Sequence, residues 1–312
     1  MERCRRSRIP ASRLGFGCAA IGGYDYGAVR DDESILAVQR ALDAGITLFD
    51  TADVYGLGHA EQILGRGLGR RRPEVIIATK VGVRWDDGGR TVRDLTPAYL
   101  ESALEASLRR LGVDCISLYQ MHWPDPRTPI DATLETLDRF RQHGKIRWIG
   151  CCNVDIAAID RAQRACRVDA VQLPFSLVDR AHETTLQHAH ATHGMLVTVY
   201  NALAQGLLTG KYDAASRFGS DDLRSRSDLF HGPRLEDGLE ALARVRVLAA
   251  RRGRTPAQIA LRWAAEQPFV DAVLAGMKTP AQVDENRSAF GWDVDTDDLI
   301  QLGAAQAAPG QR

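Results

Sequence analysis

The sequence predicts an α/β protein that folds as a single (β/α)8 barrel, the TIM-barrel architecture, over residues 1–312. The first observation is length, because 312 residues are what one such barrel needs. The second is that amphipathic helical stretches alternate with short apolar stretches after residue 30, which is typical of βα units around a parallel sheet. The third is that eight apolar stretches occur without a Pro/Gly/Ser-rich linker or a long internal repeat. We therefore expect one domain rather than two.

Each predicted strand is a short apolar run. The runs span residues 13–17, 48–50, 75–79, 116–119, 146–151, 170–174, 196–200 and 273–275. Amphipathic stretches predict helices at residues 32–44, 60–68, 97–111, 129–142, 156–165, 183–191, 235–252, 256–265 and 280–290. Four predicted helices begin at a Thr-Pro pair. The threonine hydroxyl would cap the helix, and the proline would occupy its first position. These threonines are Thr96, Thr128, Thr255 and Thr279.

The stretch from residue 201 to residue 234 follows the seventh strand and contains no predicted helix or strand. Connections of this length are usually functional, and in a barrel this one lies at the carboxyl ends of the strands, where sites are built. We expect it to act as a lid over the site. The alternative is a solvated insertion, which the Ser, Gly and Asp residues at 216 and 219–222 favour.

Charge and cysteine content exclude several classes of protein. Forty Lys and Arg balance forty Asp and Glu, so no basic field attracts nucleic acid. No run of eighteen apolar residues predicts a membrane span. Arg5 and Arg6 precede a mildly apolar run at 14–23, as in an export signal, but four glycines interrupt that run and favour a strand. Six cysteines without a CxxC pair predict reduced thiols and a cytoplasmic location, with neither zinc nor a disulfide framework.

Two patterns point to ligands that we do not expect. GFGCAA at 15–20 matches the loose GxGxxA dinucleotide fingerprint, but it does not open a helix directly, and Asp50 lies about ten residues beyond the expected acid. His190 and His193 share one face of a predicted helix, with His188 beside them, but no Cys or carboxylate accompanies them. We expect a solvated helix end there and no metal site.

Polar residues gather where three predicted strands end, in the motifs FDTADVYG at 49–56, ATK at 78–80 and YQMHWPD at 119–125. In a barrel these ends meet at the mouth. A carboxylate, a phenol, an ammonium and an imidazole there form a set for proton transfer. The ammonium would lower the pKa of the tyrosine towards neutrality, the carboxylate would hold the ammonium, and the imidazole would donate to a carbonyl oxygen. The four residues are Asp50, Tyr55, Lys80 and His122.

Singly, each of these residues has an ordinary structural explanation, such as a helix cap or a surface charge. Together, the motifs resemble the aldo-keto reductase superfamily, in its bacterial NADPH-dependent type, from residue 14 to residue 286. The resemblance implies hydride transfer from a nicotinamide cofactor to an aldehyde or ketone. By position, Tyr55 would be the general acid, Lys80 and Asp50 would tune it, and His122 would orient the carbonyl. The cofactor would be NADPH, with NADH possible, and would lie over the barrel mouth without a Rossmann fold.

The same resemblance implies the residues that bind the cofactor. Asn153 and Gln172 would hold its carboxamide, and Tyr200 would stack on the nicotinamide. A loop at 206–212 resembles the pyrophosphate side of the family's site, and residues 275–286 resemble its adenosine-phosphate segment. These two segments contribute Gly206, Leu207, Lys211, Gly276, Lys278, Gln282 and Asn286.

The chain departs from the family pattern at several of these places. Cys152 stands where Ser is usual, and Ala275 stands where Pro is usual. Gln282 stands where some members place an arginine on the 2′-phosphate, so a preference for NADPH rests mainly on Lys278. Only four of the forty basic residues are lysine, which adds modest support for the role of Lys80 because Arg would offer a different donor geometry.

Aromatic residues are expected to line the pocket for a small carbonyl substrate, although such residues also serve as packing. They are Tyr24, Trp85, Trp123 and Phe230. Two other functions stay open: reduction of an NDP-sugar or another enoyl system on the same scaffold, and a regulatory subunit that binds the cofactor and reports redox state. We expect neither a nucleic-acid nor a membrane partner, and the oligomeric state stays open.

Overall fold

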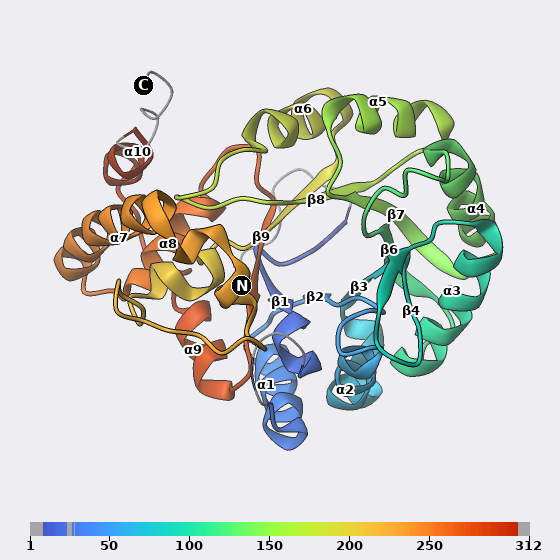
Figure 1. Cartoon of the computed structure of the whole chain (residues 1–312), viewed down its shortest axis with the longest axis horizontal. Helices are drawn as coiled ribbons and strands as arrows, with labels where there is room; N and C mark the ends of the chain where they lie inside the picture. Colours follow the sequence, from blue (N-terminus) through green and yellow to red (C-terminus); the bar gives the residue numbers. More distant parts are fainter. Residues whose placement is uncertain (1–8, 24–26, 28, 305–312) are drawn as a thin grey trace.

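The computed structural model describes residues 9–23, 27 and 29–304, and its centre is a closed barrel of eight parallel strands (Figure 1). This confirms the predicted fold. In order around the barrel the strands are β1 (Leu14–Gly17), β2 (Leu48–Asp50), β3 (Ile76–Val81), β6 (Ile116–Met121), β7 (Ile146–Cys152), β8 (Ala170–Pro174), β9 (Leu196–Tyr200) and β10 (Ala272–Gly276), and β10 pairs with β1 to close it. All eight runs predicted as strands form them, with ends that shift by one or two residues.

Helices surround the barrel and alternate with its strands (Figure 1). They are α1 (Asp31–Asp43), α2 (His59–Leu68), α3 (Pro97–Leu111), α4 (Ile130–Gln142), α5 (Ile156–Ala165), α6 (Glu183–His193), α7 (Gly232–Arg252), α8 (Pro256–Ala265) and α9 (Pro280–Arg287), with η1 (Ala19–Gly22) after β1 and η2 (Gly69–Glu74) after α2. A further helix, α10 (Thr296–Ala304), follows near the carboxyl end of the described chain and was not predicted. No helix among the described residues is long and apolar enough to cross a lipid bilayer.

Of the four threonines that precede proline, two cap their helices as predicted. Thr255 and Thr279 cap their helices, each accepting a hydrogen bond from a backbone N–H three residues ahead. Thr96 stands at the predicted cap, but its hydroxyl donates to Asp94. Thr128 was predicted wrongly, because its hydroxyl donates to the buried Asp125 and the helix begins only at Ile130. The hydroxyls of Thr96 and Thr128 thus bond to nearby carboxylates instead of capping a helix.

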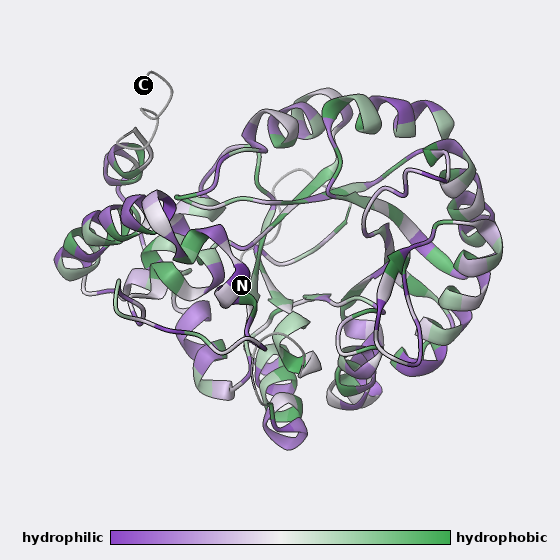
Figure 2. Ribbon diagram, viewed as in Figure 1, coloured by the Kyte–Doolittle hydropathy of each residue, from purple (hydrophilic) through white to green (hydrophobic). Residues whose placement is uncertain are grey.

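Side chains on each strand alternate between two apolar layers. On β2, Leu48 belongs to the smaller cluster inside the barrel, whereas Phe49 belongs to the larger cluster between barrel and helices. On β3, Ala78 points inward and Ile77 points outward in the same way. Figure 2 shows the consequence, with apolar strands at the centre and polar residues on the outer faces of the helices. Because both faces of every strand are covered, the strands read as continuous apolar runs.

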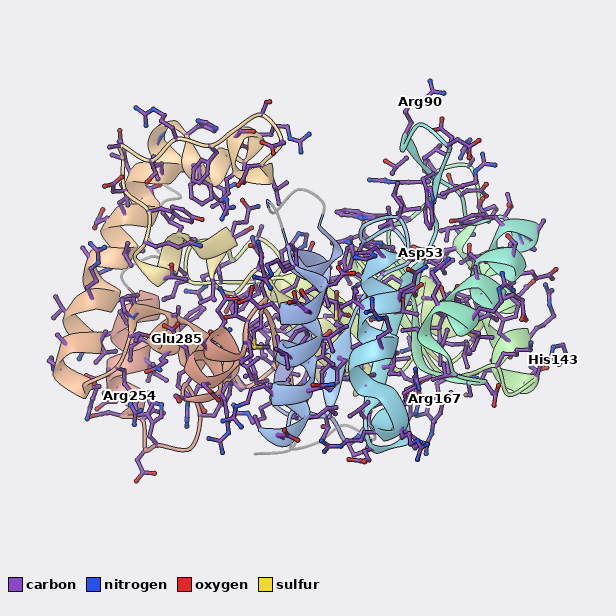
Figure 3. All side chains as sticks on the ribbon, turned by 90° about the horizontal axis from the view of Figure 1, so that it is seen from below. Asp53, Arg90, His143, Arg167, Arg254 and Glu285 are labelled. Carbon is purple, nitrogen blue, oxygen red and sulfur yellow. The ribbon has the colours of Figure 1, made fainter. Side chains whose placement is uncertain are left out.

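Two segments extend from the carboxyl end of the barrel, on opposite sides of it (Figure 3). One is a hairpin of β4 (Val83–Trp85) and β5 (Thr91–Arg93), which the sequence did not predict. The other is the connection after β9, predicted to lack regular structure. It instead contains three short 3₁₀ helices, η3 (Ala204–Thr209), η4 (Leu223–Arg226) and η5 (Asp228–Phe230), and α7 begins at residue 232 rather than 235. Rings of Tyr212, Phe218 and Phe230 pack together within this connection, with centroids 4.9–5.6 Å apart.

Candidate active site

Strand alternation places polar side chains inside the mouth of the barrel. Because Leu48 and Ala78 point inward, residues two further along the same strands also point inward, which puts Asp50 and Lys80 above the inner apolar layer. By the same rule Gln120 and Gln172 follow the inward residues of β6 and β8. All four polar side chains are buried. The interior of the barrel is therefore apolar below and charged at its carboxyl end.

Lys80 and Asp50 form the centre of this charged layer. The Lys80 ammonium donates to Asp50 Oδ2 at 2.6 Å and to the backbone oxygen of Thr51 at 2.9 Å. Asp50 Oδ1 accepts a hydrogen bond of 2.8 Å from the amide of Gln172 and a longer one of 3.5 Å from Gln120. Burial lowers the pKa of Lys80, but the Asp50 carboxylate more than offsets this, so the pKa lies above its ordinary value. Lys80 is a fixed ammonium.

Tyr55 reaches this pair from the loop after β2. Its hydroxyl oxygen accepts a hydrogen bond of 3.4 Å from Lys80 Nζ, and the ammonium lies 5.0 Å from the centre of the ring. Burial raises the pKa of Tyr55 to about 12, although the charge of Lys80 pulls it down. This corrects the expectation of a pKa near neutrality. The phenolate would lose its hydration, and the ammonium that could stabilise it is already paired with Asp50.

His122 faces the ring of Tyr55. The two ring centres are 5.8 Å apart at an angle of 83°, and His122 also stacks on Trp123 at 6.3 Å. Burial, and then the charge of Lys80, hold the pKa of His122 well below its ordinary value, so the imidazole is neutral. Its buried Nδ1 atom has no hydrogen-bond partner among the described residues. The structure thus brings Asp50, Tyr55, Lys80 and His122 together.

Asn153 and Tyr200 extend this network to β7 and β9. The side-chain amide of Asn153 donates to the backbone oxygen of His122 at 2.9 Å, and its oxygen accepts from the Tyr200 hydroxyl at 2.8 Å. Asn153 adopts a φ of 56°, in the left-handed region that asparagine tolerates better than most residues. Two of the three side chains that the resemblance assigns to the nicotinamide end are therefore linked through Asn153 to the backbone of His122.

Backbone strain in the described chain gathers around the same mouth. Besides Asn153, the non-glycine residues with positive φ are Leu57, Asn201, Ala204 and Gln205. Leu57 lies in the loop that carries Tyr55, and the other three follow β9. Such conformations persist only where their surroundings impose them, and they are common at binding and catalytic sites.

Comparison with known proteins agrees with this geometry. The model of the Aldo/keto reductase family matches residues 13–306. The chain belongs to this family. The resemblance inferred from the motifs is confirmed, and as an aldo/keto reductase the protein is an oxidoreductase.

Individual relatives cover nearly the whole chain. Aldo-keto reductase YhdN of Bacillus subtilis (strain 168) is 36% identical over 293 residues, which are 93% of this chain and 88% of that protein. The NADH-specific methylglyoxal reductase of Escherichia coli (strain K12) is 32% identical over an alignment of 315 positions, which covers 96% of each protein. Among solved structures, a glycerol dehydrogenase from Gluconobacter oxydans has a TM-score of 0.89 and 36% identity, covering 99% of this chain and 96% of that one.

Cationic side chains of this aldo/keto reductase gather at the other end of the mouth. Lys278 follows β10, and its pKa is lowered by burial and then by the charges of Arg224 and Lys211. Arg224 is paired with Asp222 at 2.6 Å. Residues from two distant parts of the chain, the connection after β9 and the segment after β10, therefore form one positively charged group, which we call the cationic group (Lys211, Arg224 and Lys278).

The remaining predicted cofactor residues lie around the cationic group. Gly206 adopts a φ of 95°, and Leu207 is fully buried, so only its backbone is available to a ligand. A Cβ on Gly276 would meet nothing closer than Ala20 at 3.8 Å, which leaves this glycine open to close approach. Gln282 accepts a hydrogen bond of 2.7 Å from the backbone N–H of Lys278, and Asn286 is buried on α9.

Of the four aromatic residues predicted as substrate walls, the three that the structure describes are not gathered in one place. Trp123 lies beside His122, with the Arg93 guanidinium 5.1 Å from its ring. Trp85 lies on the hairpin and lines a cavity of about 220 Å3 between the hairpin and α3. Phe230 packs within the connection after β9. Tyr24 lies outside the described residues. All four assignments stay predictions.

Sequence reasoning missed Arg224 and Gln120. Arg224 could not be recognised as a binding residue in the sequence, because most basic residues of this chain are arginine. Gln120 could have been found, because alternation from the inward Leu118 on β6 predicts that it faces the centre of the barrel, where it lies 3.5 Å from Asp50.

The structure also corrects the expectation for the histidines of α6. His188 and His193 were expected to stand without a carboxylate, but Asp160 on α5 lies 2.7 Å and 2.8 Å from their Nε2 atoms. The carboxylate comes from the neighbouring helix rather than from the local sequence. His190 is separate and lies 3.8 Å from Asp271.

Proposed function

We propose that this aldo/keto reductase is an NADPH-dependent carbonyl reductase, with Tyr55 as the proton donor. The observation that carries the proposal is the contact of the half-buried Tyr55 with the buried Lys80, beside the neutral His122. The phenol keeps its proton at every ordinary pH because its pKa is about 12. It is therefore always in the form that a reduction requires.

Lys80 and His122 would assist the transfer in different ways. A ketone oxygen gains negative charge as it is reduced, and the fixed Lys80 ammonium stabilises both that charge and the phenolate that Tyr55 leaves. A neutral imidazole donates one N–H to the carbonyl oxygen without competing as an acid. Asp50 and Gln172 would act indirectly, by keeping Lys80 in place. Asp50 accepts a hydrogen bond from Lys80, and Gln172 donates one to Asp50.

The residues of the mouth fit a nicotinamide dinucleotide. When bound, the cofactor supplies the hydride for the reaction. The cationic group suits its phosphates, because it brings positive charges from two distant parts of the chain together. The strained backbone after β9 and the open Gly276 allow a ligand to approach the main chain. Asn153 and Gln172 would hold the carboxamide, and Tyr200 would stack on the nicotinamide.

The substrate would be a small polar aldehyde or ketone. Relatives named as a methylglyoxal reductase and a glycerol dehydrogenase cover at least 96% of this chain, and both names concern small polar molecules. We infer NADPH rather than NADH from Lys278, whose amine belongs to the cationic group. The E. coli relative is named as NADH-specific, so this preference is a property of each chain rather than of the family.

The proposal is tested by following NADPH oxidation with a panel of aldehydes and ketones, in the parent and in Tyr55→Phe. Loss of the proton donor should lower kcat by roughly 100-fold or more and leave NADPH binding nearly unchanged. Tyr99→Phe is a matched control, because Tyr99 is another half-buried tyrosine but lies on α3. Normal turnover by Tyr55→Phe would contradict the mechanism. A parent that binds NADPH and reduces no carbonyl compound would point to a regulatory subunit, and saturation of a carbon–carbon double bond would point to an enoyl reductase.

A further inference from the structure

Two histidines and one carboxylate meet on the outer layer of helices, away from the barrel interior. His188 and His193 are on α6, and Asp160 is on the neighbouring α5 (Figure 1). One oxygen of Asp160 lies 2.7 Å from Nε2 of His188 and 2.8 Å from Nε2 of His193. The donor atoms of all three side chains lie within 4.8 Å of one another. The two rings stand edge to face, with centres 5.3 Å apart.

We propose that Asp160, His188 and His193 form a binding site for one divalent transition-metal ion, with Zn2+ as the ion of best fit. Two imidazole nitrogens and one carboxylate oxygen are ligands that Zn2+ accepts, whereas Ca2+ and Mg2+ prefer oxygen. Three protein ligands leave a fourth position for water. This site is independent of the proposed function.

The geometry needs only a small adjustment to take the ion. Ligands about 2.0–2.1 Å from a tetrahedral Zn2+ are about 3.3 Å apart. The carboxylate oxygen now lies 2.7 Å and 2.8 Å from the two nitrogens, at hydrogen-bond distance. Each imidazole would therefore move away by about half an ångström as the ion replaces the two shared protons. All three side chains are partly exposed, which gives the ion a path from solvent.

Neighbouring groups favour the ligand form of these side chains. The Thr192 hydroxyl lies 3.3 Å from Nδ1 of His188 and can accept a hydrogen bond from Nδ1–H once Nε2 binds the metal. Arg161, next to Asp160 in the chain, does not compete for it, because its guanidinium pairs with Asp131 at 2.7 Å.

The expected consequence is structural. A metal ion would join α5 to α6, which follow β7 and β8, and would not touch the inward side chains of the barrel. Because the ion binds the folded protein, it should raise the midpoint of thermal unfolding. Carbonyl reduction should not depend on it.

The test uses the untagged full-length protein, freed of metal by a chelator and titrated with Zn2+ by calorimetry. We expect one ion per chain in the parent. Asp160→Asn and His193→Gln each remove one ligand and should weaken binding by at least the 10- to 100-fold that loss of an outer partner costs. They should also abolish the Zn2+-dependent rise in the unfolding midpoint. His190→Gln is the control on the same helix and should bind Zn2+ as the parent does.

A cysteine is the competing ligand, because Cys115 is an exposed free thiol. Zn2+ binding that survives in Asp160→Asn but is lost in Cys115→Ala would overturn the proposal. So would a parent without binding of one ion per chain. Substitution with Co2+ separates the cases by absorption spectroscopy, since only a thiolate ligand adds a charge-transfer band. If circular dichroism shows that Asp160→Asn is unfolded, His193→Gln carries the same comparison.

Discussion

Tyr55 shows how burial and charge compete at a single residue. Burial raises the pKa of Tyr55 by more than the Lys80 ammonium lowers it, and the resulting pKa is about 12. The motifs around Asp50, Lys80 and His122 could be read from the sequence because each has a fixed place at the end of a strand. The pKa could not, because it depends on how much water each group loses and on the pairing of Lys80 with Asp50.

A first prediction concerns the two directions of the reaction. Reduction needs the phenol, which is present at every pH up to about 11, whereas oxidation of an alcohol needs the phenolate, which increases as pH rises towards a pKa of about 12. Lys80→Met removes the charge that stabilises the phenolate, so oxidation should fall more than reduction, and both should fall at least 100-fold. Measurement of kcat against pH in both directions checks this. Profiles of the variant that match the parent would show that Lys80 and Tyr55 are not coupled.

A second prediction concerns Asp53, which lies beneath the hairpin near the start of α2 (Figure 3). Neither of its buried oxygens has a partner among the described residues. Burial, and then the nearby Glu61, raise its pKa well above the ordinary value despite Arg110. Above about pH 3.9 the unfolded chain is ionised here while the folded chain still holds the proton, so the free energy of unfolding falls as pH rises through this window.

Asp53→Asn cannot ionise and should therefore gain stability relative to the parent as pH rises above about 3.9. Urea unfolding at several pH values measures this. Asp87→Asn in the exposed turn of the hairpin is the control for loss of an exposed carboxylate. A destabilised Asp53→Asn with no trend in pH would contradict the argument.

Among the helices and strands, those that could be predicted from the sequence are apolar or amphipathic segments that recur along the chain. Each barrel strand is covered on both faces, so its apolar run is visible without the structure. The hairpin and the three 3₁₀ helices after β9 were missed, because tertiary contacts rather than local patterns define them. The packing of Tyr212, Phe218 and Phe230 joins residues up to 18 positions apart. The contact of Asp160 with His188 likewise depends on how α5 and α6 are positioned against each other, which the spacing of residues in the sequence does not show.

A third prediction belongs to the connection after β9, expected to act as a lid. Arg224 belongs to this connection and lies close enough to Lys278 for its charge to lower the pKa of that lysine. If it closes over the cofactor, backbone amides of residues 205–230 should exchange hydrogen more slowly once NADPH is added. The hairpin on the opposite side of the mouth is an internal control and should be unchanged. Equal exchange with and without NADPH would favour a solvated insertion.

At the scale of the whole molecule, the proposed site is shared by the entire barrel. The proposed proton-transfer residues come from β2, β3 and β6 and the loops after them, and the proposed cofactor residues come from β7 to β10, the loops after them and α9. Closure of β10 on β1 brings these two groups together, although they lie far apart in the sequence. A ligand that contacts both groups should therefore stabilise the barrel as a unit.

The last prediction uses this coupling to test the choice of cofactor. A ligand at 100 times its Kd stabilises the folded state by about 2.7 kcal/mol, so saturating NADPH should raise the midpoint of thermal unfolding. If Lys278 binds the 2′-phosphate, NADH at the same concentration should stabilise the parent by about 1.4 kcal/mol less, which is a tenfold difference in Kd. Lys278→Ala should remove that difference. Lys145→Ala is the matched control, since Lys145 pairs with Glu105 at 2.6 Å on the outer surface. Equal stabilisation of the parent by NADPH and NADH would show that this chain does not select its cofactor through Lys278.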